Sequence, residues 1–129
     1  MRFLLDTRIL LWVLLTPARL SQQTQALIKS SDNEVMFSAA SIWEIAIKAR
    51  LGRDGIKARP EAVARNARAV GFAELPVDAV AAAGVADLPP HHTDPFDRLL
   101  IAQAVAGPMR LLTADAVLVQ YSELVTLVG

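Results

Sequence analysis

The hydrophobic residues of this chain fall into two alternating patterns, short continuous runs and longer runs with helical spacing. The first continuous run, Phe3-Leu4-Leu5, is typical of a strand that is buried on both faces of a parallel sheet. From Thr7 onward the apolar residues recur with helical spacing until Thr16-Pro17 ends the helix. Asp6 therefore lies between a strand and a helix. An acidic side chain at this point is either the first ligand of a cation site or the cap of the helix.

The rest of the chain continues this alternation. Further strands are predicted at 35–37, 72–76, 109–113 and 123–128, and further helices at 21–29, 39–51, 60–70, 78–88 and 94–106. Strands that alternate with helices are typical of a layered α/β domain with a parallel sheet. No linker, repeat or low-complexity tract divides the chain, so we expect one domain over residues 1–129, with strand 3–5 in the middle of the sheet.

The helix predicted at 39–51 has an apolar and a polar stripe. We expect the apolar stripe to face the core, and it consists of Ile42, Ile45, Ala46 and Ala49, widened by Trp43 and Ile47. The polar stripe beside it consists of Ser41, Glu44 and Lys48.

Composition excludes several classes of protein. There is no cysteine, so disulfides, thiolate catalysis and sulfur-ligated zinc are ruled out. The longest apolar run, from Ile9 to Leu15, is too short to span a bilayer. Asp6 and Arg8 interrupt the N-terminal apolar stretch, which argues against a signal peptide. We therefore expect a cytoplasmic protein that does not interact with membranes.

The formal net charge is zero, from 13 basic and 13 acidic residues, but the charges are unevenly distributed. Between residues 48 and 68 there are seven cations and two acids, Asp54 and Glu61, which gives a local charge of +5. This stretch is either a binding surface for a polyanion or a solvated helix face. The seven cations are Lys48, Arg50, Arg53, Lys57, Arg59, Arg65 and Arg68.

Four acidic residues lie where this architecture brings distant segments together. Asp6 and Asp115 follow predicted strands, Asp97 lies in the first turn of a helix, and Glu44 lies on the polar stripe. Carboxylates from separate segments are suited to holding a hard divalent cation such as Mg²⁺ beside a phosphate group.

Each of these acids also has a purely structural interpretation. Asp94 and Asp97 nearly form a capping box, with a proline at the favoured first helical position, and we assign Asp94 to the cap. Glu44 and Lys48 are spaced as an ordinary i,i+4 ion pair. Asp115 is placed to cap whatever follows Thr113.

Each of the four acids lies within a longer motif of the chain. The four motifs are Leu4-Leu5-Asp6-Thr7, Ser38-Ala39-Ala40-Ser41-Ile42-Trp43-Glu44-Ile45-Ala46-Ile47-Lys48, Asp94-Pro95-Phe96-Asp97-Arg98-Leu99-Leu100-Ile101-Ala102-Gln103-Ala104 and Leu112-Thr113-Ala114-Asp115. In order, they resemble the successive motifs of PIN-domain proteins, and among these the VapC-type toxins of bacterial toxin–antitoxin pairs. The resemblance extends over essentially the whole chain, and the two long motifs carry most of its specificity.

The resemblance implies a three-layer PIN fold and an endoribonuclease that depends on Mg²⁺ or Mn²⁺. It also implies a homodimer and a small VapB-type antitoxin that covers the active site. The family's catalytic and metal-binding acids map onto Asp6, Glu44, Asp97 and Asp115. Candidate contacts to the RNA substrate are Thr7, Arg8, Thr113, Arg50 and Arg53.

The chain departs from the family's pattern at two positions. Relatives commonly carry histidine after the Asp-Thr pair, whereas this chain has Arg8, a cation that is suited to binding RNA phosphate. Thr93 replaces a commonly basic residue before Asp94. His91 and His92 lie in the predicted loop 89–92, where contact with substrate is favoured over metal ligation.

Three other functions compete with the nuclease. A phosphatase of the haloacid dehalogenase type requires a second aspartate two residues after Asp6, where this chain has Arg8. A receiver-type signalling domain requires paired acids after the first strand and a lysine at a strand end, and the chain has neither. A catalytically silent PIN module that binds RNA or protein remains the alternative, because the sequence does not establish that the four acids converge.

Overall fold

The structure is a computed structural model that describes residues 1–52 and 56–129, so the predicted substrate contact Arg53 lies outside the described residues. Within this part of the chain, five parallel strands form one sheet in the order β3-β2-β1-β4-β5. The prediction that the first strand lies in the middle of the sheet is confirmed. The strands are β1 (Arg2–Leu5), β2 (Glu34–Ser38), β3 (Ala73–Leu75), β4 (Arg110–Thr113) and β5 (Val125–Leu127).

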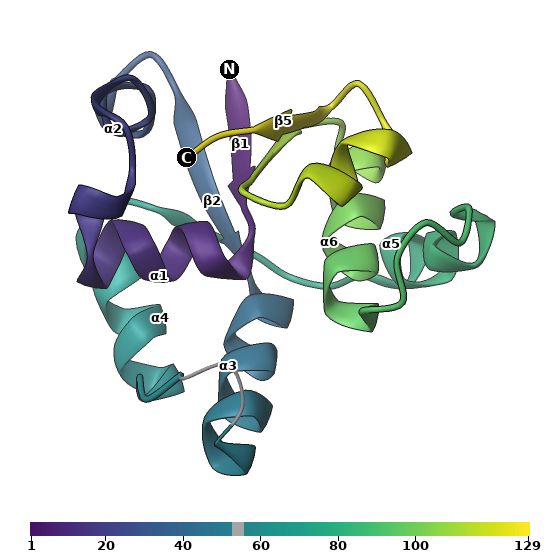
Figure 1. The fold of residues 1–129 in the computed structure, drawn as a ribbon, viewed down its shortest axis with the longest axis horizontal. Coiled ribbons are helices and arrows are strands. Elements are labelled where there is room, and N and C mark those ends of the chain that lie inside the picture. The colour runs from purple at the N-terminus through teal and green to yellow at the C-terminus, as the bar shows by residue number, and fades with distance from the viewer. Residues whose placement is uncertain (53–55) are drawn as a thin grey trace.

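Helices cover both faces of the sheet and complete a three-layer α/β domain (Figure 1). Phe3 and Leu5 of β1 belong to a core on the side of α1, α2 and α4, while Leu4 belongs to a second core on the side of α6. This alternation follows from the period of two along a strand. The α-helices are α1 (Thr7–Leu15), α2 (Gln22–Lys29), α3 (Ala39–Leu51), α4 (Pro60–Ala69), α5 (Ala79–Gly84) and α6 (Pro95–Ala106).

Local sequence signals determine most helix boundaries. The Ser21 hydroxyl caps α2 by accepting from the backbone N–H of Thr24, and Gly52 ends α3 in the left-handed conformation at φ 67°. Asp78 caps α5 in the same way as Ser21 caps α2. Among the described residues, no helix has both the length and the hydropathy needed to cross a membrane.

Several predicted elements differ in detail from the observed ones. The predicted helix 78–88 is α5 followed by the 3₁₀ helix η3 (Val85–Asp87). After β4, the 3₁₀ helix η4 (Ala116–Tyr121) begins directly after Asp115, which caps it as the sequence suggested. In α3 the assignment of Trp43 to the buried stripe is wrong, because its side chain is 59% exposed. Ser41 and Glu44, assigned to the polar stripe, are buried. This side of α3 faces α1 rather than solvent, since Thr7 lies within hydrogen-bond distance of both residues.

Candidate active site

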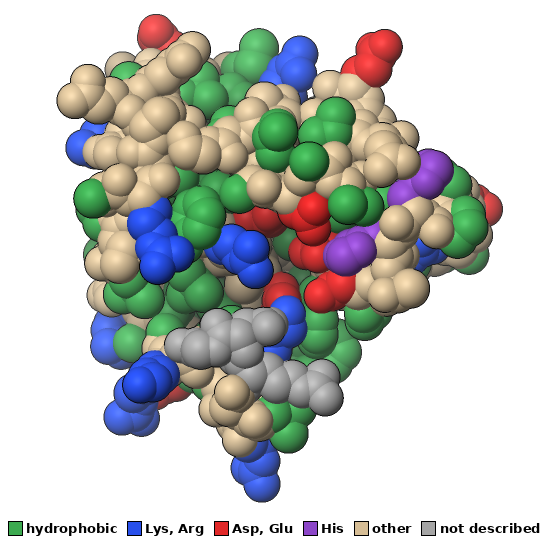
Figure 2. All heavy atoms as spheres, in the orientation of Figure 1, with side chains coloured by type: hydrophobic (Ala, Val, Ile, Leu, Met, Phe, Trp, Pro, Cys, Tyr) green, Lys and Arg blue, Asp and Glu red, His purple; other side chains and the backbone are tan. Residues whose placement is uncertain are grey.

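The four predicted acids converge at the carboxyl edge of the sheet. Asp6 follows β1 and Asp115 follows the neighbouring strand β4, while α3 supplies Glu44 and the first turn of α6 supplies Asp97. All four line one cavity of about 610 Å³. Figure 2 shows the acidic side chains gathered in a hollow, with basic side chains on one side and histidine on the other. The expected convergence is therefore observed.

Asp6 is both a helix cap and a wall of this cavity, so the two interpretations left open by the sequence are compatible. Its Oδ1 accepts a hydrogen bond of 2.8 Å from the backbone N–H of Ile9, which caps α1. Its Oδ2 accepts a hydrogen bond of 2.5 Å from the Thr113 hydroxyl at the end of β4. Burial raises the pKa of Asp6 to about 6, although these two hydrogen bonds oppose the change.

Glu44 is held from two sides. The Thr7 hydroxyl donates to its Oε1 at 2.5 Å, and the Lys48 ammonium lies 2.5 Å from its Oε2. Lys48 also lies 3.6 Å from Oδ2 of Asp94. The i,i+4 pair suggested by the sequence therefore forms, but it is a buried pair, with only 6% of the Glu44 side chain exposed. Lys48 thus neutralises part of the negative charge of the cluster.

The structure separates the roles of Asp94 and Asp97. Oδ1 of Asp94 accepts hydrogen bonds from the backbone N–H groups of Phe96 and Asp97, so Asp94 caps α6 as predicted. The Asp97 carboxylate instead accepts from His92, whose Nε2 is 3.0 Å from its Oδ2. Burial and the charges of Asp94, Asp6 and Glu44 raise the pKa of Asp97 to about 7. Carboxylates held this close together are expected to attract a cation.

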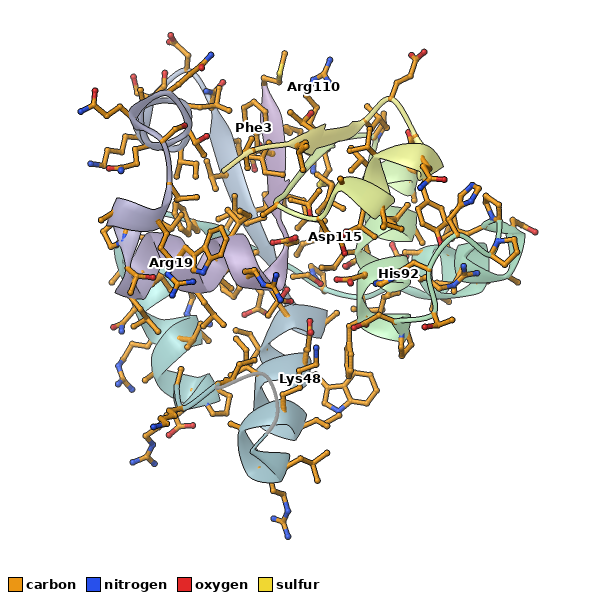
Figure 3. All side chains as sticks on the ribbon, in the orientation of Figure 1. Phe3, Arg19, Lys48, His92, Arg110 and Asp115 are labelled. Carbon is orange, nitrogen blue, oxygen red and sulfur yellow. The ribbon has the colours of Figure 1, made fainter. Side chains whose placement is uncertain are left out.

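His92 is the site residue that the sequence indicated least. Its Nε2 lies 4.0 Å from Oδ2 of Asp115, and Figure 3 shows the two side chains next to each other. The loop before α6 is folded back against η4, because the Tyr121 hydroxyl accepts from the backbone N–H of His92 and lies 3.1 Å from Nη1 of Arg98. These partners are distant in the sequence, so no local pattern would have identified the position of His92.

The donor set fits a hard divalent cation. Ligand atoms of His92, Asp94 and Asp97 all lie within 4.8 Å of one another. Asp6 and Asp115 line the same cavity. Most of these donors are carboxylate oxygens, which Mg²⁺ and Mn²⁺ prefer. Burial first, and neighbouring carboxylates second, raise the pKa values of Asp6 and Asp97, and a bound cation would favour the ionised form of both.

The opposite wall of the cavity is basic and apolar. Arg8, Arg19 and Lys57 line it together with apolar side chains of α1 and of residues 56–58. Arg50 is exposed near the end of α3 and is not among the described residues that line the cavity. Two further cations of the 48–68 stretch pair with acids elsewhere on the surface, Arg59 with Glu61 and Arg68 with Glu74.

Comparison with known proteins agrees with this architecture. VapBC2 from Rickettsia felis, solved bound to a DNA fragment from its promoter, is similar in fold with a TM-score of 0.73 at 13% identity, and the match covers 100% of both chains. At this identity the likeness concerns the fold alone. No curated protein matches the chain. The family model of the PIN domain matches residues 3–124. Because this match covers nearly the whole chain and the fold agrees with it, the protein belongs to the PIN-domain family.

Proposed function

We propose that this protein is a Mg²⁺- or Mn²⁺-dependent endoribonuclease and the toxin of a VapBC-type toxin–antitoxin pair. The observation that carries the proposal is the convergence of Asp6, Glu44, Asp97 and Asp115 on one cavity from four separate segments. The raised pKa values of Asp6 and Asp97 support it, because the site binds protons when no cation is present.

In this proposal Asp6, Asp97, Asp115 and Glu44 hold the cation. When bound, the cation supplies positive charge for the scissile phosphate and favours ionisation of a water molecule. The chain's own residues orient the ligands: the Thr113 hydroxyl fixes one oxygen of Asp6, and His92 fixes one oxygen of Asp97. Such hydrogen bonds restrict each carboxylate to one orientation before substrate arrives.

The proposed partners follow from the family and from the surface of the cavity. RNA is the expected substrate, since Arg8, Arg19 and Lys57 provide cations beside the acids. The solved relative in R. felis is a VapBC2 assembly, and we propose a small VapB-type antitoxin and a homodimer for this chain as well.

One observation favours a second candidate, a catalytically silent PIN module. Both carboxylate oxygens of Glu44 already have partners, Thr7 and Lys48, so this acid is partly neutralised without a metal. In the enzyme, Lys48 must release or share Glu44 when the cation binds. In the silent module, the Glu44–Lys48 pair persists and the site binds RNA without cleaving it.

Cleavage of RNA by the purified protein separates the two candidates. The nuclease cleaves single-stranded RNA with Mg²⁺ or Mn²⁺, loses the activity in chelator, and loses it by orders of magnitude on Asp97→Asn. Asp32→Asn is the matched control, because Asp32 is exposed in the turn before β2, at the opposite edge of the sheet. RNA binding without cleavage at any metal concentration would reject the nuclease in favour of the silent module.

A further inference from the structure

One face of α1 extends the cavity away from the acidic cluster. This face, which we call the α1 stripe, consists of Arg8, Leu11, Trp12, Leu15 and Arg19, the last in the 3₁₀ helix η1 (Pro17–Arg19). The spacing of the first four by three or four places them along one side of α1, and Arg19 reaches the same side from η1, where it lies over the Trp12 ring. At 1.5 Å per residue, Trp12 lies about 9 Å along the helix from Asp6. The α1 stripe therefore begins at the proposed catalytic acids and leads away from them within one cavity.

The far part of the α1 stripe offers stacking surfaces. The Arg19 guanidinium lies over the Trp12 ring, 5.6 Å from its centroid, and both side chains line the cavity. Trp12 is half-buried, so the ring is supported by the core while remaining accessible. Aromatic rings and guanidinium planes are the groups on which proteins stack unpaired RNA bases.

The charges along the α1 stripe are opposite to those of the acidic wall. Arg8, Arg19 and Lys57 are exposed and line this part of the cavity. In the part of the chain that the structure describes, no carboxylate lies within 4 Å of any of these three cations. Unpaired cations beside a flat aromatic surface complement a nucleotide, which has both a phosphate and a planar base.

We propose that the α1 stripe is a nucleotide subsite, which binds one unpaired nucleotide of the RNA adjacent to the scissile phosphodiester. The base stacks on Trp12 and Arg19, and Arg8 and Lys57 contact the phosphate. This subsite rests on the proposed function, since it concerns the same substrate. A peptide of a partner protein is the other conceivable occupant, but the three cations and the arginine–tryptophan stack favour a polyanion with planar groups.

The two tryptophans of the chain allow a direct test by fluorescence. Trp43 is 59% exposed, makes an edge-to-face contact with Phe96, and is not among the described residues that line the cavity. Trp43→Phe therefore leaves Trp12 as the only reporter. In chelator, where the proposed cleavage is blocked, short oligoadenylate should quench this fluorescence in a saturable manner. An oligonucleotide with the same ribose-phosphate backbone but without bases should bind more weakly and quench little.

Variants separate stacking from charge. Trp12→Leu should weaken oligoadenylate binding by about 5- to 150-fold, the range expected for one stacked base, and should leave the salt dependence unchanged. Trp12→Phe should restore much of the affinity. Arg8→Gln should reduce the slope of log affinity against log salt by about one. Fluorescence anisotropy of labelled oligoadenylate measures these affinities, since the two Trp12 variants lack the fluorescent reporter. Thermal melts identify any variant that fails to fold, and if Trp12→Leu does not fold, the comparison of quenching by the two oligonucleotides in Trp43→Phe decides.

Absence of quenching by oligoadenylate would overturn the subsite, as would equal binding of the oligonucleotide without bases. Quenching by a peptide of the co-expressed antitoxin, with no effect of RNA, would overturn it in favour of a protein partner. The proposed function fails separately: quenching without cleavage in Mg²⁺ or Mn²⁺ removes the nuclease and keeps the subsite. Cleavage without quenching removes the subsite alone.

Discussion

Replacing Asp97 with asparagine should stabilise the metal-free protein, because the folded structure disfavours the charge on this residue. The folded-state pKa of Asp97 is about 7, against an ordinary value of 3.8. Each factor of ten in proton affinity corresponds to about 1.36 kcal/mol, so ionised Asp97 costs on the order of 4 kcal/mol at pH 8. The side chain is only 20% exposed, so solvent screens this cost weakly. The asparagine side chain carries no charge and still offers His92 an amide oxygen.

The sign of this effect depends on pH. A folded-state pKa above the unfolded value means that the folded protein holds the proton more tightly. The resulting stabilisation is fully present below about pH 4 and is lost as the pH rises through 7. In chelator, Asp97→Asn should therefore melt higher than the parent at pH 8, by on the order of 10 °C, and the difference should disappear towards pH 4.

Thermal melts with and without metal measure both parts of this prediction. Added Mg²⁺ should stabilise the parent by mass action, about 2.7 kcal/mol at a hundredfold excess over the dissociation constant, and the variant much less. Asp32→Asn should show neither effect. A variant that melts lower than the parent in chelator at pH 8, with an equal response to Mg²⁺, would refute the reasoning and assign Asp97 a purely structural role in α6.

Three further predictions concern two groups beside the acids and the basic stretch between residues 48 and 68. Thr113→Val removes the donor to Asp6 and should lower the free energy of unfolding at pH 8 by about 1–3 kcal/mol, while Thr113→Ser retains it; urea unfolding measures both. Lys48→Met leaves the buried Glu44 carboxylate without this cation and should lower the free energy of unfolding of the metal-free protein by about 3–5 kcal/mol. The double variant Lys48→Met with Glu44→Gln should lose less stability, because no uncompensated charge remains, and urea unfolding compares the two. Replacing Arg50, Arg53 and Arg59 with glutamine should reduce the slope of log RNA affinity against log salt concentration. An unchanged slope would mean that the basic stretch is a solvated surface.

Local signals made the fold largely predictable from the sequence. The apolar run before Asp6, the cap at Ser21 and the stop at Gly52 act within a few residues, and the elements they predicted are observed. β5 is shorter than predicted, and as an edge strand it has a hydrogen-bonded neighbour on one side only. The predicted helix after Asp78 is α-helical only to Gly84 and continues as the 3₁₀ helix η3.

The site was predictable as a set of acids but not as a network. Sequence order placed Asp6 and Asp115 at strand ends, which a parallel sheet brings to one edge. The burial of Glu44 depends on Thr7 in another helix, and the position of His92 depends on Tyr121, 29 residues away. Contacts of this kind are set by tertiary packing, so a single sequence without a structure carries no signal for them.

The hydrogen bond between Thr113 and Asp6 joins residues that are 107 positions apart. The central strand β1 is synthesised before its neighbour β4 and before the acid that follows β4. On the ribosome, Asp6 therefore emerges long before Asp97, Thr113 and Asp115 have been added. For a protein proposed to cleave RNA, this order delays the assembly of its active site until synthesis has passed residue 115.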